Sequence, residues 1–310
     1  MSHQAPASAE RSSLLSTLAP FIAGPVAGVC SRFVIYPSDT IKARLQVQGS
    51  LGRSKSQLYK STLDAASQML RREGFKAFYR GFGVVVVGNV PANMAYFGGY
   101  ELGKWLLPDR SGLLSNMATG AIAQLSGGLL FTPVDIIKER MQVQGIMQGH
   151  FSYTGSWHAL TSLLKDRGPM GLFRGYWATN AVWIPWSVLH IAAYEQFKGR
   201  AADAYPGMQE PLRSPDDLPP WVLGSCSAAS ASLAALATQP MDVVKTRLQV
   251  LSATGASQPT AIALAKQALQ KEGMQVFMSG AFARILTLAP GASLSWMIYQ
   301  PLMGILTREG

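Results

Sequence analysis

The sequence predicts an all-α membrane protein built from three copies of one two-helix unit. Two short motifs recur in the same order three times along the 310 residues, and a repeat of this kind defines the architecture before any single element does. Charged residues make up only 14% of the chain, well below the roughly 25% of typical soluble domains. Six apolar stretches come close to the roughly 20 residues that a helix needs to cross a bilayer.

The first motif places an acid, a lysine, an arginine and a glutamine at fixed distances after a proline. It starts at Pro37, Pro133 and Pro240. A proline kinks a helix because it removes a backbone hydrogen bond, and an acid and a lysine three residues apart lie on nearly one helical face. Charges near a membrane core must face the interior and find partners. We therefore expect three kinked helices to converge through Asp39, Lys42, Asp135, Lys138, Asp242 and Lys245.

Each unit takes its two spans from the apolar stretches before its proline and after the second motif, a glycine pair seven residues apart. The predicted spans are 14–36 and 82–100 in repeat 1 (14–108), 113–132 and 176–194 in repeat 2 (109–204), and 221–239 and 281–299 in repeat 3 (219–310). Many contain Gly, Ala and Ser, which let helices approach closely in a membrane. Pro, Ser and acidic residues predict a tail at 1–13 and a linker at 205–218.

The loops differ in charge. The long loop inside each unit is rich in Lys and Arg, whereas the loop after residue 194 carries Glu210, Asp216 and Asp217. The positive-inside rule then predicts that the long loops face the inner compartment and that both termini face the outer one. Segments such as 58–72 and 153–165 are expected to form amphipathic helices at the membrane surface.

Several other classes of protein are not expected. The net charge of +10 is distributed by loop rather than gathered on a stacking surface, so nucleic acid is not a predicted partner. The cysteines, Cys30 and Cys226, stand singly within apolar stretches and predict neither a disulfide framework nor a metal site. No phosphate loop, nucleophile motif or ligand cluster is present, so we expect neither an enzyme nor a cofactor. The first residues contain no apolar core of a secretory signal.

The triplicated proline motif, with a glycine pair after each copy, resembles the mitochondrial carrier family. The resemblance implies six transmembrane helices in a pseudo-threefold barrel, three short matrix-side surface helices, and a monomer in the mitochondrial inner membrane with both termini on the intermembrane-space side. It implies transport of a small molecule by alternating access. It also implies a matrix gate in which Asp39 pairs with Lys138, Asp135 with Lys245 and Asp242 with Lys42, braced by Gln46, Gln142 and Gln249.

The same resemblance implies an outer gate on the second helix of each unit, formed by an aromatic residue, an acid and a base. Two copies match, and they contain Tyr100, Glu101 and Lys104, and Tyr194, Glu195 and Lys198. The third copy has Tyr299, Gln300 and Met303 instead. Glu101 with Lys198 would then be the one full charge pair, so we expect a weak outer gate.

Substrate contacts are implied seven and eight residues after the second glycine of each unit, at Gly88, Asn89, Val182, Trp183, Thr287 and Leu288. None of these is charged. Arg32 and Arg284 are further cations within the spans, and together they could clamp one carboxylate. With Trp183 and Trp186 as an apolar wall, the predicted substrate is a neutral amino acid or another monocarboxylate.

Two alternatives stay open. Ile184, Pro185 and His190 resemble a segment of mitochondrial iron carriers, and imidazole is a common ligand of transition metals. An iron or other divalent metal carrier is therefore the first alternative, although one histidine does not make a metal site. The second is a membrane scaffold without transport, which would have little reason to retain buried charges.

Overall fold

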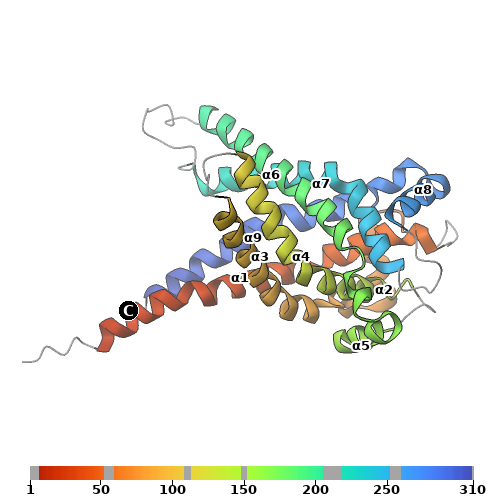
Figure 1. Ribbon diagram of the computed structural model, residues 1–310, viewed down its shortest axis with the longest axis horizontal. Coiled ribbons are helices and arrows are strands. Elements are labelled where there is room, and N and C mark those ends of the chain that lie inside the picture. Colours follow the sequence, from red (N-terminus) through yellow and green to blue (C-terminus); the bar gives the residue numbers. More distant parts are fainter. Residues whose placement is uncertain are drawn as a thin grey trace, which may run out of the picture.

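The computed structural model describes residues 7–51, 59–107, 113–147, 152–204, 218–251 and 260–308. Within these ranges every regular element is a helix (Figure 1). The long helices are α1 (Ala7–Val47), α3 (Phe82–Leu106), α4 (Leu113–Val143), α6 (Tyr176–Ala204), α7 (Pro220–Leu251) and α9 (Ala281–Arg308), and the short ones are α2 (Thr62–Glu73), α5 (Ser156–Arg167) and α8 (Ala261–Glu272).

The ends of the first predicted segments need correction. Helix α1 begins at Ala7, inside the segment 1–13 that we expected to be a tail, because Ala, Ser, Glu and Arg allow a helix to start before the apolar run. Residues 1–6 of that segment and 205–217 of the predicted linker lie outside the described residues. Helices α4 and α7 continue past Pro133 and Pro240, as expected of kinked helices, since a proline can bend a membrane helix without ending it.

The glycine pairs connect the short helices to the long helices that follow. All six glycines have positive φ, a backbone conformation that favours glycine, and they are Gly74, Gly81, Gly168, Gly175, Gly273 and Gly280. Gly81 also lies against the next repeat, because a Cβ there would come within 3.3 Å of the Lys138 backbone. The recurring pair thus ends one helix, turns the chain and starts the next.

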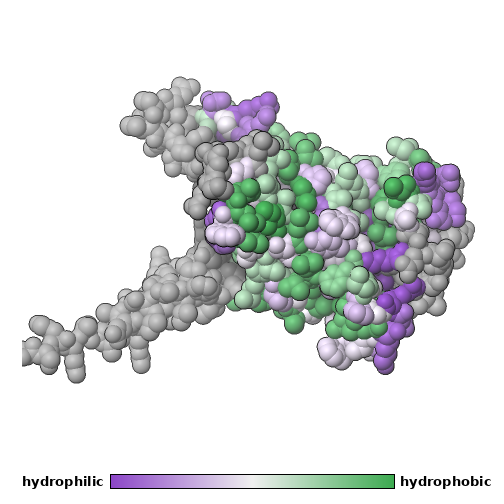
Figure 2. Space-filling model, viewed as in Figure 1, coloured by the Kyte–Doolittle hydropathy of each residue, from purple (hydrophilic) through white to green (hydrophobic). Residues whose placement is uncertain are grey.

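The long helices contact one another in a closed cyclic order: α1, α3, α4, α6, α7, α9 and again α1. The short helices α2, α5 and α8 gather at one end of the molecule (Figure 1), which we call the surface-helix end. On the face shown in Figure 2, hydrophobic residues cover the middle and hydrophilic residues gather toward the ends. In the described ranges, Met117–Val143 and Trp221–Leu251 are the helices that are long and apolar enough to cross a membrane by length and composition.

Candidate functional site

Three ion pairs link the repeats in a closed ring. Lys138 Nζ lies 2.5 Å from Asp39 Oδ2, Lys245 Nζ lies 2.7 Å from Asp135 Oδ2, and Lys42 Nζ lies 2.7 Å from Asp242 Oδ2. These are the pairs that the sequence predicted. We call them the ion-pair ring. In each proline motif the aspartate pairs with the lysine of one neighbouring repeat, and the lysine pairs with the aspartate of the other. Each of the three aspartates and three lysines therefore belongs to one pair of the ring.

The motif arginines form a second set of links between repeats. The Nε atoms of Arg44 and Arg247 donate to the carbonyl oxygens of Gln142 and Gln46, at 2.9 and 2.8 Å. Arg140 Nε makes the corresponding bond to the Gln249 carbonyl at 3.3 Å. All three arginines are buried. Six polar links therefore connect the motif segments of α1, α4 and α7.

Two of the three glutamine braces lie where the sequence predicted. Gln46 Nε2 donates to Asp242 Oδ2 at 2.7 Å, and Gln142 Nε2 donates to Asp39 Oδ2 at 3.5 Å. The third glutamine, Gln249, bonds to other groups. In the amide orientation that satisfies both neighbours, its nitrogen donates to Glu139 Oε2 at 2.7 Å and its oxygen accepts from Thr179 Oγ1 at 3.2 Å. Glu139 diverts this amide because it places a second carboxylate beside Asp135.

Sequence reasoning missed Glu139. Its carboxylate lies 3.6 Å from Lys245 Nζ, and its side chain is 6% exposed. The signal was the acid immediately after the motif lysine, which only repeat 2 has; the other repeats have Ala43 and Thr246 there. Lys245 thus faces two carboxylates, whereas Lys138 and Lys42 each pair with one.

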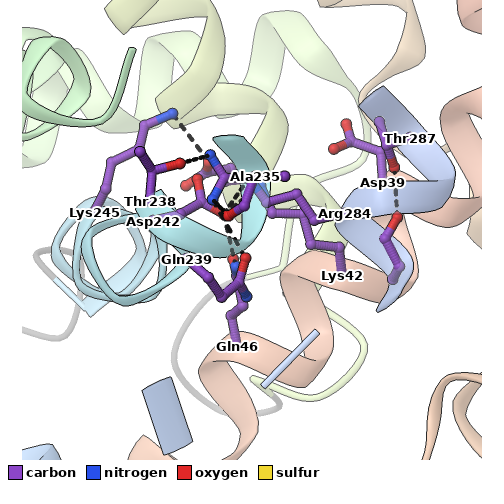
Figure 3. A network of polar contacts seen from close by, with 12 residues as sticks. Asp39, Lys42, Gln46, Ala235, Thr238, Gln239, Asp242, Lys245, Arg284 and Thr287 are labelled. Carbon is purple, nitrogen blue, oxygen red and sulfur yellow. Dashed lines mark hydrogen bonds and ion pairs between the residues drawn. The ribbon is translucent and has the colours of Figure 1, made fainter. Parts of the chain in front are cut away.

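Arg284, one of the two arginines of the predicted clamp, is bound to α7. Its guanidinium donates to the Ala235 carbonyl and to Thr238 Oγ1, each at 3.0 Å, and Nε lies 3.6 Å from Asp242 Oδ2. Figure 3 shows these groups converging on Arg284 beside Lys42. With 2% exposure, Arg284 links α9 to the kinked part of α7.

A cavity of about 370 Å³ lies above the ion-pair ring. This volume is within the range of small-ligand sites. Its lining includes all six charged residues of the ring together with Arg32, Glu139, Trp183, Trp186, Arg284, Thr287 and Leu288. One cavity is thus shared by four of the predicted substrate-binding residues: Arg32, Trp183, Thr287 and Leu288. Arg284 also lines it, with its guanidinium bound to α7.

The other three implied contact positions do not line the cavity. Val182 is completely buried in protein. Gly88 faces α4, since a Cβ on it would overlap the Val134 side chain. Asn89 lies on α3, and its carbonyl accepts a hydrogen bond from Asn93. A count of residues from the glycine does not show how a helix is rotated about its own axis, and this rotation decides which side chains of α3 and α6 face the cavity.

The predicted pair between Glu101 and Lys198 is absent from this conformation. Glu101 pairs with Lys104 at 2.9 Å and Glu195 pairs with Lys198 at 3.0 Å, both within one helix. The lysines also lie over Tyr100 and Tyr194, 4.4 and 5.5 Å from the ring centroids. Bases three residues from acids can pair locally when the helix ends are not brought together. The side chains of Tyr299, Gln300 and Met303 lie outside the described part of the structure.

His190 has an ordinary structural partner. Its Nδ1 lies 2.9 Å from Ser230 Oγ, and its ring stacks on Trp186 with centroids 4.9 Å apart. Among the described residues, no group of three His, Cys, Asp or Glu side chains could hold a metal ion.

An ion pair tethers α2 to the end of α1, and the sequence reasoning did not predict it. Glu73 Oε2 accepts from Arg44 at 2.9 Å, and Arg80 pairs with the same carboxylate. Burial raises the pKa of Glu73, but the two arginines outweigh it and hold this pKa below its usual value. The available signal was an acid before the first glycine, present as Glu73 and Glu272.

The chain belongs to the mitochondrial carrier family. The family described as mitochondrial carrier protein matches residues 13–111, 109–204 and 216–310. Its proteins are transporters of the mitochondrial inner membrane with several membrane spans. The chain is therefore a transporter, and the resemblance seen in the triplicated motif is confirmed.

The names of its relatives do not agree on one substrate. The chain is 33% identical over 299 residues to mitochondrial substrate carrier family protein E of Dictyostelium discoideum, covering 93% of this chain and 95% of the relative. It is 28% identical over 302 residues to the mitochondrial S-adenosylmethionine carrier protein of Xenopus tropicalis, covering 94% and 97%. It is 27% identical over 303 residues to mitoferrin-2 of Homo sapiens, covering 93% and 77%.

Proposed function

We propose that this protein carries a small monocarboxylate by alternating access, with the ion-pair ring as its inner gate. The observation that supports this most is the position of the ring directly beneath the cavity, between three different repeats. Opening the gate requires the three pairs to separate. Because each pair joins two repeats, they can separate when the repeats move relative to one another.

The cyclic order of helix contacts supports a six-helix pseudo-threefold barrel with α2, α5 and α8 as matrix-side surface helices. We expect a monomer in the mitochondrial inner membrane, with both termini on the intermembrane-space side, since the basic loops belong inside. In that orientation the structure corresponds to the state that is closed toward the matrix. Protease accessibility of terminal tags in intact and permeabilised mitochondria tests the orientation.

The cavity offers one available cation. Arg32 is exposed and lines the cavity, and within the described ranges its guanidinium has no hydrogen bond or ion pair. The lysines of the ring already face carboxylates. One cation suits a substrate with one carboxylate.

The aromatic wall favours an uncharged body on that substrate. Trp183 and Trp186 pack edge to face with ring centroids 5.5 Å apart, and both line the cavity. Neutral amino acids and keto acids have one carboxylate and such an uncharged body. It could also accept a planar ring, so the S-adenosylmethionine of one relative's name is a second candidate. Iron is disfavoured by the exposed Arg32 and by the partner of His190.

Uptake into liposomes tests the proposal. The purified protein should take up one of a panel of labelled leucine, pyruvate, branched keto acids, S-adenosylmethionine, malate, ATP and Fe²⁺. Arg32→Leu should lower uptake by about 10- to 100-fold, the value of a charge-assisted hydrogen bond of roughly 1.5–3 kcal/mol. Arg200→Leu is a matched control, because Arg200 is exposed on α6 and is not a lining residue. Uptake of ATP or Fe²⁺ alone would contradict the substrate class, and no uptake at all would favour the scaffold.

A further inference from the structure

In repeats 1 and 3 a carboxylate connects the surface helix to the motif arginine. Glu73 at the end of α2 pairs with Arg44 and also with Arg80. Glu272 at the end of α8 pairs with Arg247 through both oxygens, at 2.5 and 2.8 Å. These are two-point contacts between a guanidinium and a carboxylate, the geometry that Arg favours.

The next repeat covers each of these carboxylates with a glycine. A Cβ on Gly145, just after α4, would overlap the Glu73 carboxylate, and a Cβ on Gly49, just after α1, would overlap the Glu272 carboxylate. The tether of one repeat is thus packed under the chain of the following repeat. The residue that corresponds to these glycines after α7 is Ser252, which lies outside the described residues.

Repeat 2 has the opposite charge at the tether position. Its α5 ends at Arg167, immediately before Gly168, as α2 ends at Glu73 before Gly74. The arginines that would flank a carboxylate are both present, as Arg140 and Arg174. We call Arg140, Arg167 and Arg174 the arginine triad.

Arg167 lies close enough to Arg140 and to Arg174 to repel the charge of each. Arg167 acts unfavourably on the charge of Arg140, while Tyr153 and Asp166 act favourably on it. Burial lowers the pKa of Arg174, and the neighbouring Arg167 lowers it further. The acid Asp166 is exposed on α5. The repulsion coincides with the longest of the three arginine-to-carbonyl links, 3.3 Å against 2.9 and 2.8 Å.

We propose that the arginine triad binds a phosphate-class anion in the place that the Glu73 carboxylate occupies in repeat 1. The argument rests on the sign of the charge at residue 167, since Arg140 and Arg174 keep contacts of their own within the protein. A phosphate presents several oxygens that planar guanidinium groups can contact in pairs. The bound anion neutralises the triad and links α5 to α4, as the carboxylates link α2 to α1 and α8 to α7.

The anion can come from a free phosphate or from the headgroup of an acidic lipid. Both present the same oxygens, and the site lies at the surface-helix end, where water and headgroups are both within reach. The binding site itself does not depend on what the cavity carries. Its effect is to strengthen the contact between repeats 2 and 3, which Arg140 makes through Gln249.

Thermal stability of the purified full-length protein in neutral detergent tests this site. Inorganic phosphate is titrated against chloride at equal ionic strength, and cardiolipin micelles are compared with phosphatidylcholine micelles in a second arm. The wild type should gain roughly 2–4 °C in Tm from at least one anion. Arg167→Glu should raise Tm without any anion, because it restores the acid of repeats 1 and 3, and it should abolish the gain.

Lys165→Glu is the matched control, since it makes the same charge change at an exposed position of the same helix. It should keep the gain. Arg167→Gln, which removes the charge without adding an acid, should reduce the gain and serves if the glutamate variant does not fold. A rise in Tm with phosphate that depends on residue 167 identifies the ligand as a soluble anion. A rise in Tm with cardiolipin alone identifies it as a lipid headgroup. The proposal is overturned if neither anion gives a gain that depends on residue 167, or if Lys165→Glu loses as much as Arg167→Glu.

Discussion

Replacing Lys245 by Met should destabilise the protein more than replacing Lys42 by Met. Both substitutions remove an ammonium, buried at Lys245 and 15% exposed at Lys42, and keep an unbranched apolar side chain. Lys245→Met leaves two carboxylates, Asp135 at 2.7 Å and Glu139 at 3.6 Å, without their shared cation. Lys42→Met leaves only Asp242, which keeps the amide of Gln46 at 2.7 Å and Arg284 at 3.6 Å.

Removing one partner of a buried ion pair costs about 3–5 kcal/mol. Lys245→Met should fall at the upper end of this range, because Glu139 is 6% exposed and the lysine itself only 5%. Lys42→Met should fall at the lower end. The difference of about 1–2 kcal/mol corresponds to roughly 2–8 °C in Tm for a chain of this size.

Differential scanning fluorimetry of the purified variants measures the order. Adding Glu139→Gln to Lys245→Met should recover part of the loss, since one carboxylate rather than two then lacks a cation. Glu139→Gln alone should change Tm little, because the new amide can still bond to Gln249. Equal losses for the two lysine variants, or no recovery in the double variant, would refute the idea that Lys245 serves two acids.

Three further outcomes are expected. Trp186→Phe should keep the aromatic wall and remove a buried N–H that has no hydrogen-bond partner among the described residues, so Tm should not fall, because a buried unsatisfied donor costs free energy; a lower Tm would show that this N–H makes a stabilising contact. Gln300→Glu combined with Met303→Lys should slow transport by about 2- to 5-fold, because an added pair of up to about 1 kcal/mol strengthens the outer closure; equal or faster liposome uptake would contradict this. Because its folded pKa is lowered, Glu73 stabilises the protein above its usual pKa of 4.5, and this contribution is lost as pH falls through the lowered pKa. The acid limb of Tm against pH should therefore flatten in Glu73→Gln, and an unchanged limb would show that the tether contributes nothing.

Fixed spacing within a repeated motif made the ion-pair ring predictable. An acid and a lysine three residues apart define one helical face, and threefold repetition requires that each face meets its copies. Amphipathic stretches in the basic loops predicted two of the short helices, at 58–72 and 153–165, where the structure has α2 and α5. Periodicity therefore predicted the kinked helices and a ring of acids and lysines, while the resemblance to the carrier family supplied the individual partners of Asp39, Asp135 and Asp242.

The differences between the repeats were harder to predict. Glu139 and Arg167 each occur once, so no repetition indicates what they contact, and Glu139 takes the amide of Gln249 from the ring. The rotation of a helix about its axis is also not encoded in a count from a glycine, which is why Gly88 packs on α4 while Thr287 lines the cavity. Arg284 was predicted to bind the substrate, and in the structure its guanidinium donates to polar groups of α7.

The closed cyclic order of the long helices follows the order of the chain and adds one interface that no chain segment bridges. Repeat 3 meets repeat 1 through α9 and α1, and Figure 1 shows these two helices side by side along much of their length. This non-covalent seam uses the same lysine-to-aspartate and arginine-to-carbonyl links as the two interfaces that the chain itself bridges. A circular permutant that starts with repeat 3 and continues through repeats 1 and 2 would therefore contain every one of those interfaces.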